Sequence, residues 1–355
     1  MNDVSDPPPP SPPSSPSPSP EQPEAATAAI EPRASWSRAA EIVGWLALGP
    51  AAWVTISRAL SIQRPLRVTV LLQALTPFVY LVVWPIAALA AWRRRWLLGG
   101  VAAAFALVHV AAVWPAVGVR DQPRWAATAS ALTLLESNAY VGNADPKAAA
   151  RTLLAAHADV MVIVEAPFGL DDALRAQGVD ATYPYRNREL ADRYTGEIIY
   201  SRFALTDGGR AQLGRKKQAP VVTVDVNGTP LRLAAVHLKE PLALGSEWAD
   251  ELRDLATLAS ADKGPTVLTG DFNGTRWQPA FGDALLPHLH DADEAVGRGL
   301  SFSWPIGHHL PVPIMRLDHT LVNEGVAVLA VHDLDVPGSD HRGEIVELAI
   351  KPRGA

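Results

Sequence analysis

Several apolar stretches of this chain end on, or are followed by, a polar side chain that can bind a metal ion or move a proton. These polar residues are Asn138, Glu165, His237, Asp271, Asn273, Asp318, His319, Asp340 and His341. Each one alone fits a solvated strand end or a hydrogen-bonded core side chain. Gathered at one rim of a sheet, however, so many carboxylates and imidazoles would be costly to bury without charge partners or a metal. Their types and spacing therefore indicate a metal or acid/base site built at strand ends.

The elements that would position these residues follow from hydrophobic periodicity. Strands are expected over 132–135, 160–164, 197–200, 221–226, 231–236, 266–269 and 345–350, and helices over 146–157 and 244–260. Asp145 before Pro146 is a candidate N-cap for the first of these helices. This mixture predicts an α/β fold of sheets covered by helices. Several strands follow one another without a helix between them, which argues against a simple doubly wound sheet.

In chain order, the segments ESNAYVGN, VMVIVE, IIYSR, AAVHL, TGDFN, LDH and SDHR resemble the endonuclease/exonuclease/phosphatase superfamily. This superfamily includes deoxyribonuclease I, exonuclease III, inositol polyphosphate phosphatases and bacterial sphingomyelinases. The resemblance begins near Leu132 and extends to the C-terminus. It implies a catalytic domain over 131–355 with a four-layer α/β fold, a two-sheet β-sandwich flanked by helices.

The resemblance also implies hydrolysis of a phosphodiester by metal-assisted attack of water. The cofactor would be Mg²⁺, with Mn²⁺ as a substitute, because Mg²⁺ prefers oxygen ligands, one or two carboxylates among them. The expected metal ligands are Asn138, Glu165 and Asp340.

The catalytic residues that the resemblance implies are His237, Asp271, Asn273, Asp318 and His341. Asp271 would orient or deprotonate the attacking water, and Asn273 would hold that water or the scissile phosphate. His341 would contact the phosphate with its ring oriented by Asp318, and His237 would be a second histidine facing the phosphate. Asn273 also begins an N-x-[ST] glycan acceptor pattern, but a glycan there would fill the site, so the match is interpreted as chance.

Three different segments precede this domain. Residues 1–35 are rich in proline and serine with few large apolar side chains, which predicts a disordered tail. Residues 36–119 hold two or three expected transmembrane helices. Charge-free runs over 68–92 and 96–119 are long enough to cross a bilayer, whereas a third run over 43–57 is short. Residues 120–130 are an expected polar linker.

Membrane placement follows in part from the resemblance. The layout is similar to that of membrane-anchored bacterial members, which implies a multi-pass protein of the cell membrane with an extracytoplasmic catalytic domain. The arginines flanking the expected spans divide evenly between the two sides, so charge alone does not orient the chain.

Composition limits the substrate and excludes some chemistries. There is no cysteine, which excludes thiolate metal sites and cysteine nucleophiles, and the net charge of −6 gives no general basic field for nucleic acid. The expected substrate is a nucleic acid or related phosphodiester, and the alternative is a phospholipid or sphingomyelin-type phosphodiester. The alternative to an enzyme is a non-catalytic, membrane-anchored binding module on the same scaffold. Beyond substrate and bilayer, the sequence indicates no protein partner.

Overall fold

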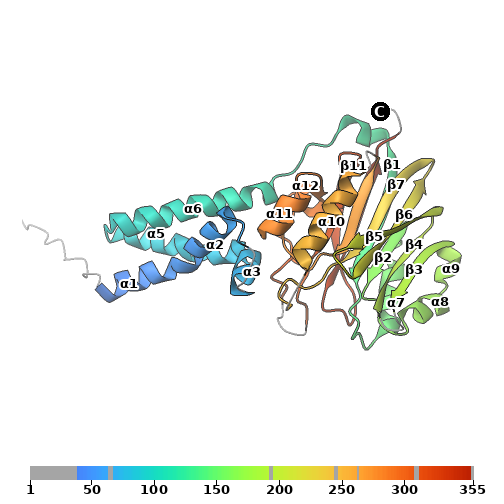
Figure 1. Cartoon of the computed structure of the whole chain (residues 1–355), viewed down its shortest axis with the longest axis horizontal. Helices are drawn as coiled ribbons and strands as arrows, with labels where there is room; N and C mark the ends of the chain where they lie inside the picture. The colour runs from blue at the N-terminus through green and yellow to red at the C-terminus, as the bar shows by residue number, and fades with distance from the viewer. Residues whose placement is uncertain are drawn as a thin grey trace, which may run out of the picture.

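The computed structural model describes residues 38–62, 67–191, 195–243, 247–261, 264–307 and 312–352. The expected tail over 1–35 and the expected start of a helix at Leu244 lie outside these residues. In the described part of the chain, an elongated bundle of helices adjoins an α/β body (Figure 1).

The α/β body contains two six-stranded sheets. The first has the order β11-β12-β1-β2-β4-β3 and is formed by β1 (Ser130–Asn138), β2 (Val160–Val164), β3 (Tyr185–Ala191), β4 (Thr195–Ser201), β11 (Val326–Asp335) and β12 (Arg342–Ile350). The second has the order β5-β6-β7-β8-β10-β9 and is formed by β5 (Leu205–Leu213), β6 (Lys217–Val226), β7 (Thr229–His237), β8 (Thr266–Asp271), β9 (His290–Asp291) and β10 (Asp318–Val322).

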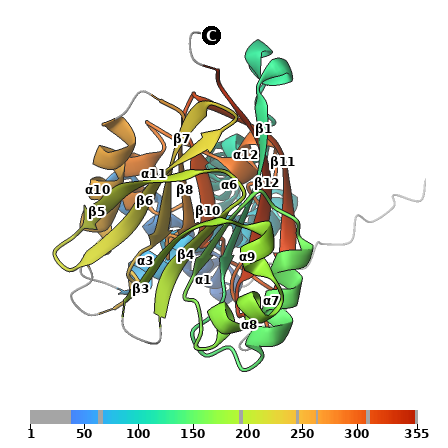
Figure 2. The same cartoon turned by 90° about the vertical axis from the view of Figure 1, so that its right-hand side faces the viewer.

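The two sheets pack face to face, with helices on their outer faces (Figures 1 and 2). Apolar side chains of both sheets share one core, for example Leu134 and Val162 with Leu233 and Val267. The first sheet is covered outside by α7 (Pro146–Ala155), α8 (Leu170–Ala176) and α9 (Val179–Thr182), and the second by α10 (Trp248–Ser260) and α11 (Pro279–Leu285). A short helix, α12 (Ala292–Ala295), follows β9. The expected four-layer α/β fold is confirmed.

Two parallel strand pairs, one in each sheet, fix where side chains gather. β1 runs parallel to β2, and β7 runs parallel to β8, so the carboxyl ends of each pair meet at one edge. β10 is antiparallel to β8 and β12 is antiparallel to β1, and each therefore begins where its partner ends. The residues that follow the four parallel strands thus meet those that open β10 and β12.

The helical region consists of α1 (Arg38–Ala47), α2 (Gly49–Ala59), α3 (Arg67–Ala74), α4 (Thr76–Val79), the 3-10 turn η1 (Tyr80–Val82), α5 (Val83–Trp92) and α6 (Trp96–Val117). Two helical stretches of 22 residues each, Arg38–Ala59 and Trp96–Val117, are long and apolar enough to cross a membrane. The stretch from Arg67 to Trp92 is a different case, because the chain bends by 82° between Ala74 and Thr76. Residues 68–92 therefore do not form one straight helix, because α3 is set across the direction of α4 and α5.

The connection to the sheets is more ordered than a polar linker. Val119 forms an isolated bridge with Val296, and the 3-10 helix η2 (Arg124–Thr128) directly precedes β1. Gln122 also donates a hydrogen bond to the Val328 carbonyl. The segment between α6 and β1 is thus held against the α/β body.

Candidate active site

The polar residues at the strand ends lie at one edge of the sandwich. They are Asn138 at the end of β1, Glu165 just after β2, His237 at the end of β7, Asp271 at the end of β8, Asp318 at the start of β10, and Asp340 and His341 before β12. Asp271 is the register partner of both His237 and Asp318, so it lies between them in the second sheet. Sequence spacing alone placed these residues at strand ends, and the sheet order brings them together.

A cavity of about 940 Å³ opens at this edge. Its lining includes Glu165, His237, Asp271, Asn273, Asp340 and His341. Asn138 and Asp318 are fully buried and are not part of the lining. The site thus has side chains that face the cavity and others that support them from below.

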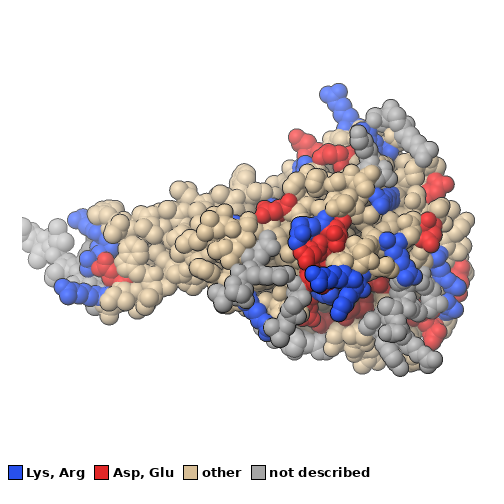
Figure 3. Space-filling model, viewed as in Figure 1, with Lys and Arg blue, Asp and Glu red and all other residues tan. Residues whose placement is uncertain are grey.

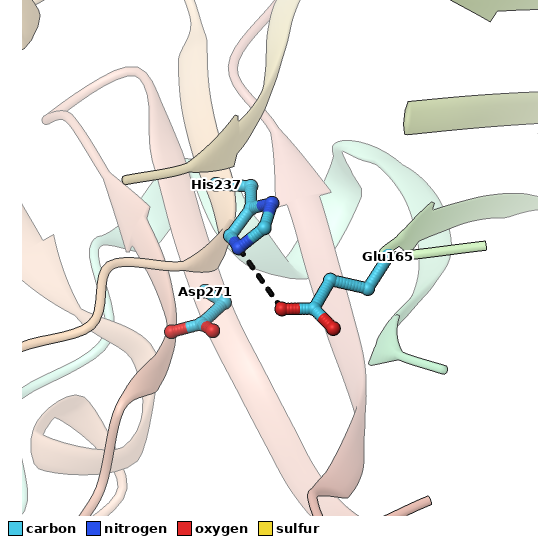
Figure 4. A group of neighbouring side chains, drawn as sticks. All are labelled: Glu165, His237 and Asp271. Carbon is cyan, nitrogen blue, oxygen red and sulfur yellow. Dashed lines mark ion pairs between the residues drawn. The ribbon is translucent and has the colours of Figure 1, made fainter. Parts of the chain in front are cut away.

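Glu165, His237 and Asp271 converge on one point of the cavity wall, as Figure 4 shows. Their ligand atoms all lie within 4.8 Å of one another, and His237 Nε2 is 3.2 Å from Glu165 Oε1. Burial raises the pKa of Glu165, but the hydrogen bond and charge of His237 and the Val141 N–H together lower it to about 2. Glu165 is therefore ionised at neutral pH and available to a cation.

A second group joins Asp271 to Asp318 and His341, again with ligand atoms within 4.8 Å of one another. His341 Nδ1 donates a hydrogen bond to Asp318 Oδ2 over 2.8 Å. Burial lowers the pKa of His341, but the charges of Asp318, Asp271 and Asp340 outweigh burial and raise it to about 10. The imidazolium form is thus held in place under the cavity, with its ring orientation fixed by Asp318.

Asp271 is fixed by hydrogen bonds from both sides. Its Oδ2 accepts from Asn138 Nδ2 at 3.0 Å and from Asn273 Nδ2 at 3.2 Å, and its Oδ1 accepts from the Asn273 backbone N–H at 2.7 Å. Burial and the nearby Asp318 raise the pKa of Asp271. A carboxylate that is both oriented and more basic than usual is suited to accept a proton from water.

The backbone around these residues adopts conformations that few side chains tolerate. Gly270 has φ +139°, and a Cβ there would lie 1.9 Å from the Val236 carbonyl oxygen. Glu165 and Asn273 both have φ +49°, a left-handed conformation that is rare for residues other than glycine. Such local strain is typical of functional sites, where the fold must aim a side chain. Here it turns the ends of β2 and β8 toward the cavity.

The amide of Asn138 has partners at both ends. While its Nδ2 donates to Asp271, its Oδ1 accepts from the Tyr140 backbone N–H at 2.9 Å. The Asn273 side chain is similarly engaged, because its Nδ2 also donates to the Leu238 carbonyl at 3.0 Å. This amide nitrogen, the atom that a glycan would modify, is therefore already committed within the site.

Two further residues support the site, and Glu136 is the one that was not anticipated from the sequence. Glu136, two positions before Asn138 on β1, is fully buried, and neither of its carboxylate oxygens has a hydrogen-bond partner within the described part of the chain. Burial, Asp318 and Asp271 raise its pKa well above the ordinary value of a glutamate. Trp304 donates its indole N–H to Asp340 Oδ2 at 3.3 Å. The alternation of β1, which turns Glu136 to the same face as Asn138, is the one signal that could have revealed it.

His319, whose role the sequence left open, supports the loop after Asp271. Its Nδ1 lies 2.5 Å from Asp291 Oδ2, and its Nε2 lies 3.0 Å from the Gly274 carbonyl. The ring is almost entirely buried and does not line the cavity. His319 is therefore a structural clamp on the Asn273–Gly274 turn.

The donor set fits a divalent metal ion. Glu165 and Asp271 present carboxylate oxygens toward each other at the cavity, and Asp340 Oδ1 is a buried oxygen without a hydrogen-bond partner among the described residues. Hard cations such as Mg²⁺ take oxygen ligands of this kind. Thiolate ligands are absent because the chain has no cysteine.

Comparison with known proteins agrees with this arrangement. The model of the Endonuclease/Exonuclease/phosphatase family matches residues 135–341, which is more than half of the chain and spans all the residues described above. The chain belongs to this family. No curated protein gives a significant match. Family members are metal-dependent hydrolases of phosphoester bonds, and the chain is accordingly an enzyme of this class.

Solved structures of the family share the fold at low sequence identity. TDP2 of D. rerio, in a humanized form with 14 mutations, superposes with a TM-score of 0.52 at 17% identity, covering 62% of this chain and 99% of that one. The same values hold for D. rerio TDP2 complexed with a single-strand DNA product. The human Nocturnin catalytic domain with bound sulfate gives a TM-score of 0.48 at 15% identity, covering 63% of this chain and 96% of that one.

Proposed function

We propose that this protein is a membrane-anchored, Mg²⁺-dependent phosphodiesterase whose site is the cavity at the strand ends. The observation that carries the proposal is the convergence of the acidic and histidine groups around Asp271, the residue shared by the two clusters. The membrane anchor is supported by the two 22-residue apolar helices that precede the α/β body. From the sequence we propose four segments: a tail over 1–35, an anchor over 36–119, a connection over 120–130 and a catalytic domain over 131–355.

Glu165 and Asp340 are the residues we assign to the metal. When bound there, Mg²⁺ would neutralise charge on the phosphoryl oxygens and stabilise the leaving oxygen. Asn138 was expected to be a third ligand, but its amide is committed to Asp271 and the Tyr140 N–H. We therefore assign Asn138 to orienting Asp271.

The remaining residues divide the work of hydrolysis. Asp271 accepts a proton from the attacking water as the water oxygen bonds to phosphorus, and Asn273 hydrogen-bonds the phosphate or that water. His341, protonated and oriented by Asp318, donates a hydrogen bond to a phosphoryl oxygen. The bond from phosphorus to one ester oxygen breaks, and that oxygen takes up a proton from His237 or His341, which both face the cavity. The products are a phosphomonoester and an alcohol.

Metal binding tests this assignment independently of turnover. We expect Glu165→Gln to weaken Mg²⁺ affinity by at least about tenfold, because loss of even an outer partner of a metal ligand commonly costs that much. The measurement is calorimetric titration of the purified full-length protein in detergent after removal of bound metal.

Two further variants complete the metal titration. Glu347→Gln, on an exposed part of β12, is the matched control and should bind Mg²⁺ like the wild type. Asn138→Ala should also keep its Mg²⁺ affinity while losing turnover, since we assign it to Asp271. If Glu165→Gln bound Mg²⁺ normally, the metal site would lie elsewhere.

Nucleic acid is the first substrate class that the sequence indicated, and a phospholipid or sphingomyelin-type phosphodiester is the alternative. Among similar structures, D. rerio TDP2 is complexed with a single-strand DNA product, although the likeness is one of fold. A non-catalytic binding module on this scaffold is disfavoured, since each expected acidic and histidine group is present at the cavity or directly below it.

A further inference from the structure

One wall of the catalytic cavity comes from the helical region rather than from the α/β body. Val70, Leu71 and Ala74 of α3 line the same cavity as Asp271 and His341. Leu71 and Val68 of this helix are 38% and 55% exposed. The active site is therefore completed by an apolar helix that belongs to the membrane-proximal part of the chain.

Several specific contacts join the helical region to the α/β body. Thr275 lies two residues after Asn273, and its Oγ1 donates a hydrogen bond to the Ala74 carbonyl at 3.4 Å. Ser61 Oγ donates to Asp283 Oδ2 at 3.2 Å, and Arg58 donates to the Trp277 carbonyl. The rings of Phe78 and Phe302 also meet, with centroids 5.4 Å apart. These contacts tie the helical region to the segment that follows the catalytic strand β8.

Charge places the bilayer surface at the level of α3. Between residues 38 and 119, the charged side chains of the described part are Arg38, Glu41, Arg58, Arg67, Arg93, Arg94 and Arg95. Arg95 pairs with Glu41 at the end of the bundle far from the α/β body, and the surface between this end and the body is mostly uncharged (Figure 3). A 22-residue helix is about 33 Å long, close to the ~30 Å of a hydrocarbon core. With the far end at one surface, Arg58 and Arg67 lie toward the other, and Arg67 begins α3, the helix that lines the cavity.

The cavity is amphipathic in the way that a lipid headgroup requires. Val70, Leu71 and Leu242 line it together with Lys216 and Lys217. Leu242, like Leu71, is more than a third exposed, so apolar surface continues outward from the cavity. A cationic side suits a phosphate, whereas an apolar side next to the bilayer suits the alkyl part of the same molecule.

We propose that the substrate is a phosphodiester of a membrane lipid, presented to the cavity from the bilayer surface across α3. This proposal rests on the proposed phosphodiesterase function and specifies its substrate class. Water adds to the phosphorus of the lipid phosphodiester, one phosphorus–oxygen ester bond breaks, and the departing oxygen leaves as an alcohol. The alkyl part stays in the bilayer, with α3 forming the boundary between it and the metal site.

The test compares three substrates with the full-length protein in Mg²⁺: vesicles of phosphatidylcholine, phosphatidylglycerol or sphingomyelin, a single-stranded oligodeoxynucleotide, and the water-soluble ester bis(p-nitrophenyl) phosphate. We expect kcat/KM to be highest for one of the lipids. Leu71→Ser should lower the ratio of lipid to soluble-ester turnover by about tenfold, the size expected for losing one apolar side-chain contact. Leu329→Ser, which replaces a similarly exposed leucine on β11 outside the cavity lining, should leave that ratio unchanged.

The possible results test the lipid substrate and the phosphodiesterase function separately. Faster turnover of the oligodeoxynucleotide than of every lipid, or a Leu71→Ser ratio equal to that of the wild type, would overturn the lipid proposal while leaving the phosphodiesterase intact. Absence of Mg²⁺-dependent turnover of all three substrates would instead overturn the proposed function itself. Circular dichroism and gel filtration of both serine variants show whether each is folded, and a second lining variant, Val70→Ser, repeats the test if Leu71→Ser does not fold.

Discussion

Asp271→Asn is expected to lower kcat for phosphodiester hydrolysis by about 10³-fold while leaving the protein folded. The asparagine keeps the shape, but it has a single accepting oxygen where Asp271 accepts hydrogen bonds on both carboxylate oxygens, and it cannot take a proton from water. Because burial and Asp318 raise the pKa of Asp271, its carboxylate is a better base than an exposed aspartate, and its loss costs correspondingly more. The measurement is steady-state hydrolysis of bis(p-nitrophenyl) phosphate by the full-length protein.

The matched control for this substitution is Asp180→Asn. Asp180 pairs with Arg186 on the surface and does not line the cavity. It should turn over the ester at the wild-type rate. An Asp271→Asn protein as active as Asp180→Asn would show that another group activates the water.

Asp318→Asn is expected to change the pH dependence of the reaction. In the wild type the charge of Asp318 helps raise the pKa of His341 from 6.5 to about 10, so the imidazolium persists through this range. Without that charge, His341 loses its proton at lower pH. The activity of Asp318→Asn should therefore fall by about 10²-fold as the pH rises from 6.5 to about 10, whereas the wild type stays active. A pH–rate profile of both proteins measures the effect.

The same pair contributes to stability with a definite sign. The folded pKa of His341 lies above its unfolded value, so the stabilisation is fully present below pH 6.5 and is lost as pH rises through about 10. The difference in unfolding free energy between wild type and Asp318→Asn should therefore shrink over that interval.

Glu324→Gln, which removes the carboxylate beside His290 at the surface, is the control for the pH–rate measurement and should leave the pH–rate profile unchanged. A profile for Asp318→Asn that matched the wild type would remove His341 from the proposed mechanism.

The strand ends were predictable because their signal is local. Five apolar residues before Glu165, or an apolar run before Asp271, show that a buried strand delivers a carboxylate to a loop. The order of the strands in each sheet was not predictable in this way, because paired strands such as β1 and β12 lie far apart in the sequence. Strand β5 escaped prediction because its sequence LTDGGRAQL is largely polar and exposed at the sheet edge.

Other features depend on tertiary contacts that no spacing encodes. The Asn138 amide could bind a metal or a neighbouring side chain, and only the approach of Asp271 decides between them. Glu136 reads as one polar residue in an apolar strand until its burial beside Asp318 is known. The bend after α3 was equally hidden, because residues 68–92 have the composition of a straight crossing. In each case the sequence specifies the residue, and its neighbours specify its role.

The central claim is that the cavity around Asp271 hydrolyses phosphodiesters with a divalent metal. Its most direct test is hydrolysis of bis(p-nitrophenyl) phosphate by the full-length protein after treatment with EDTA and then with added Mg²⁺. We predict that EDTA abolishes turnover and that Mg²⁺ restores it in the wild type but not in Asp271→Asn. Turnover that survives EDTA undiminished, or that Mg²⁺ restores equally in both proteins, would contradict the claim.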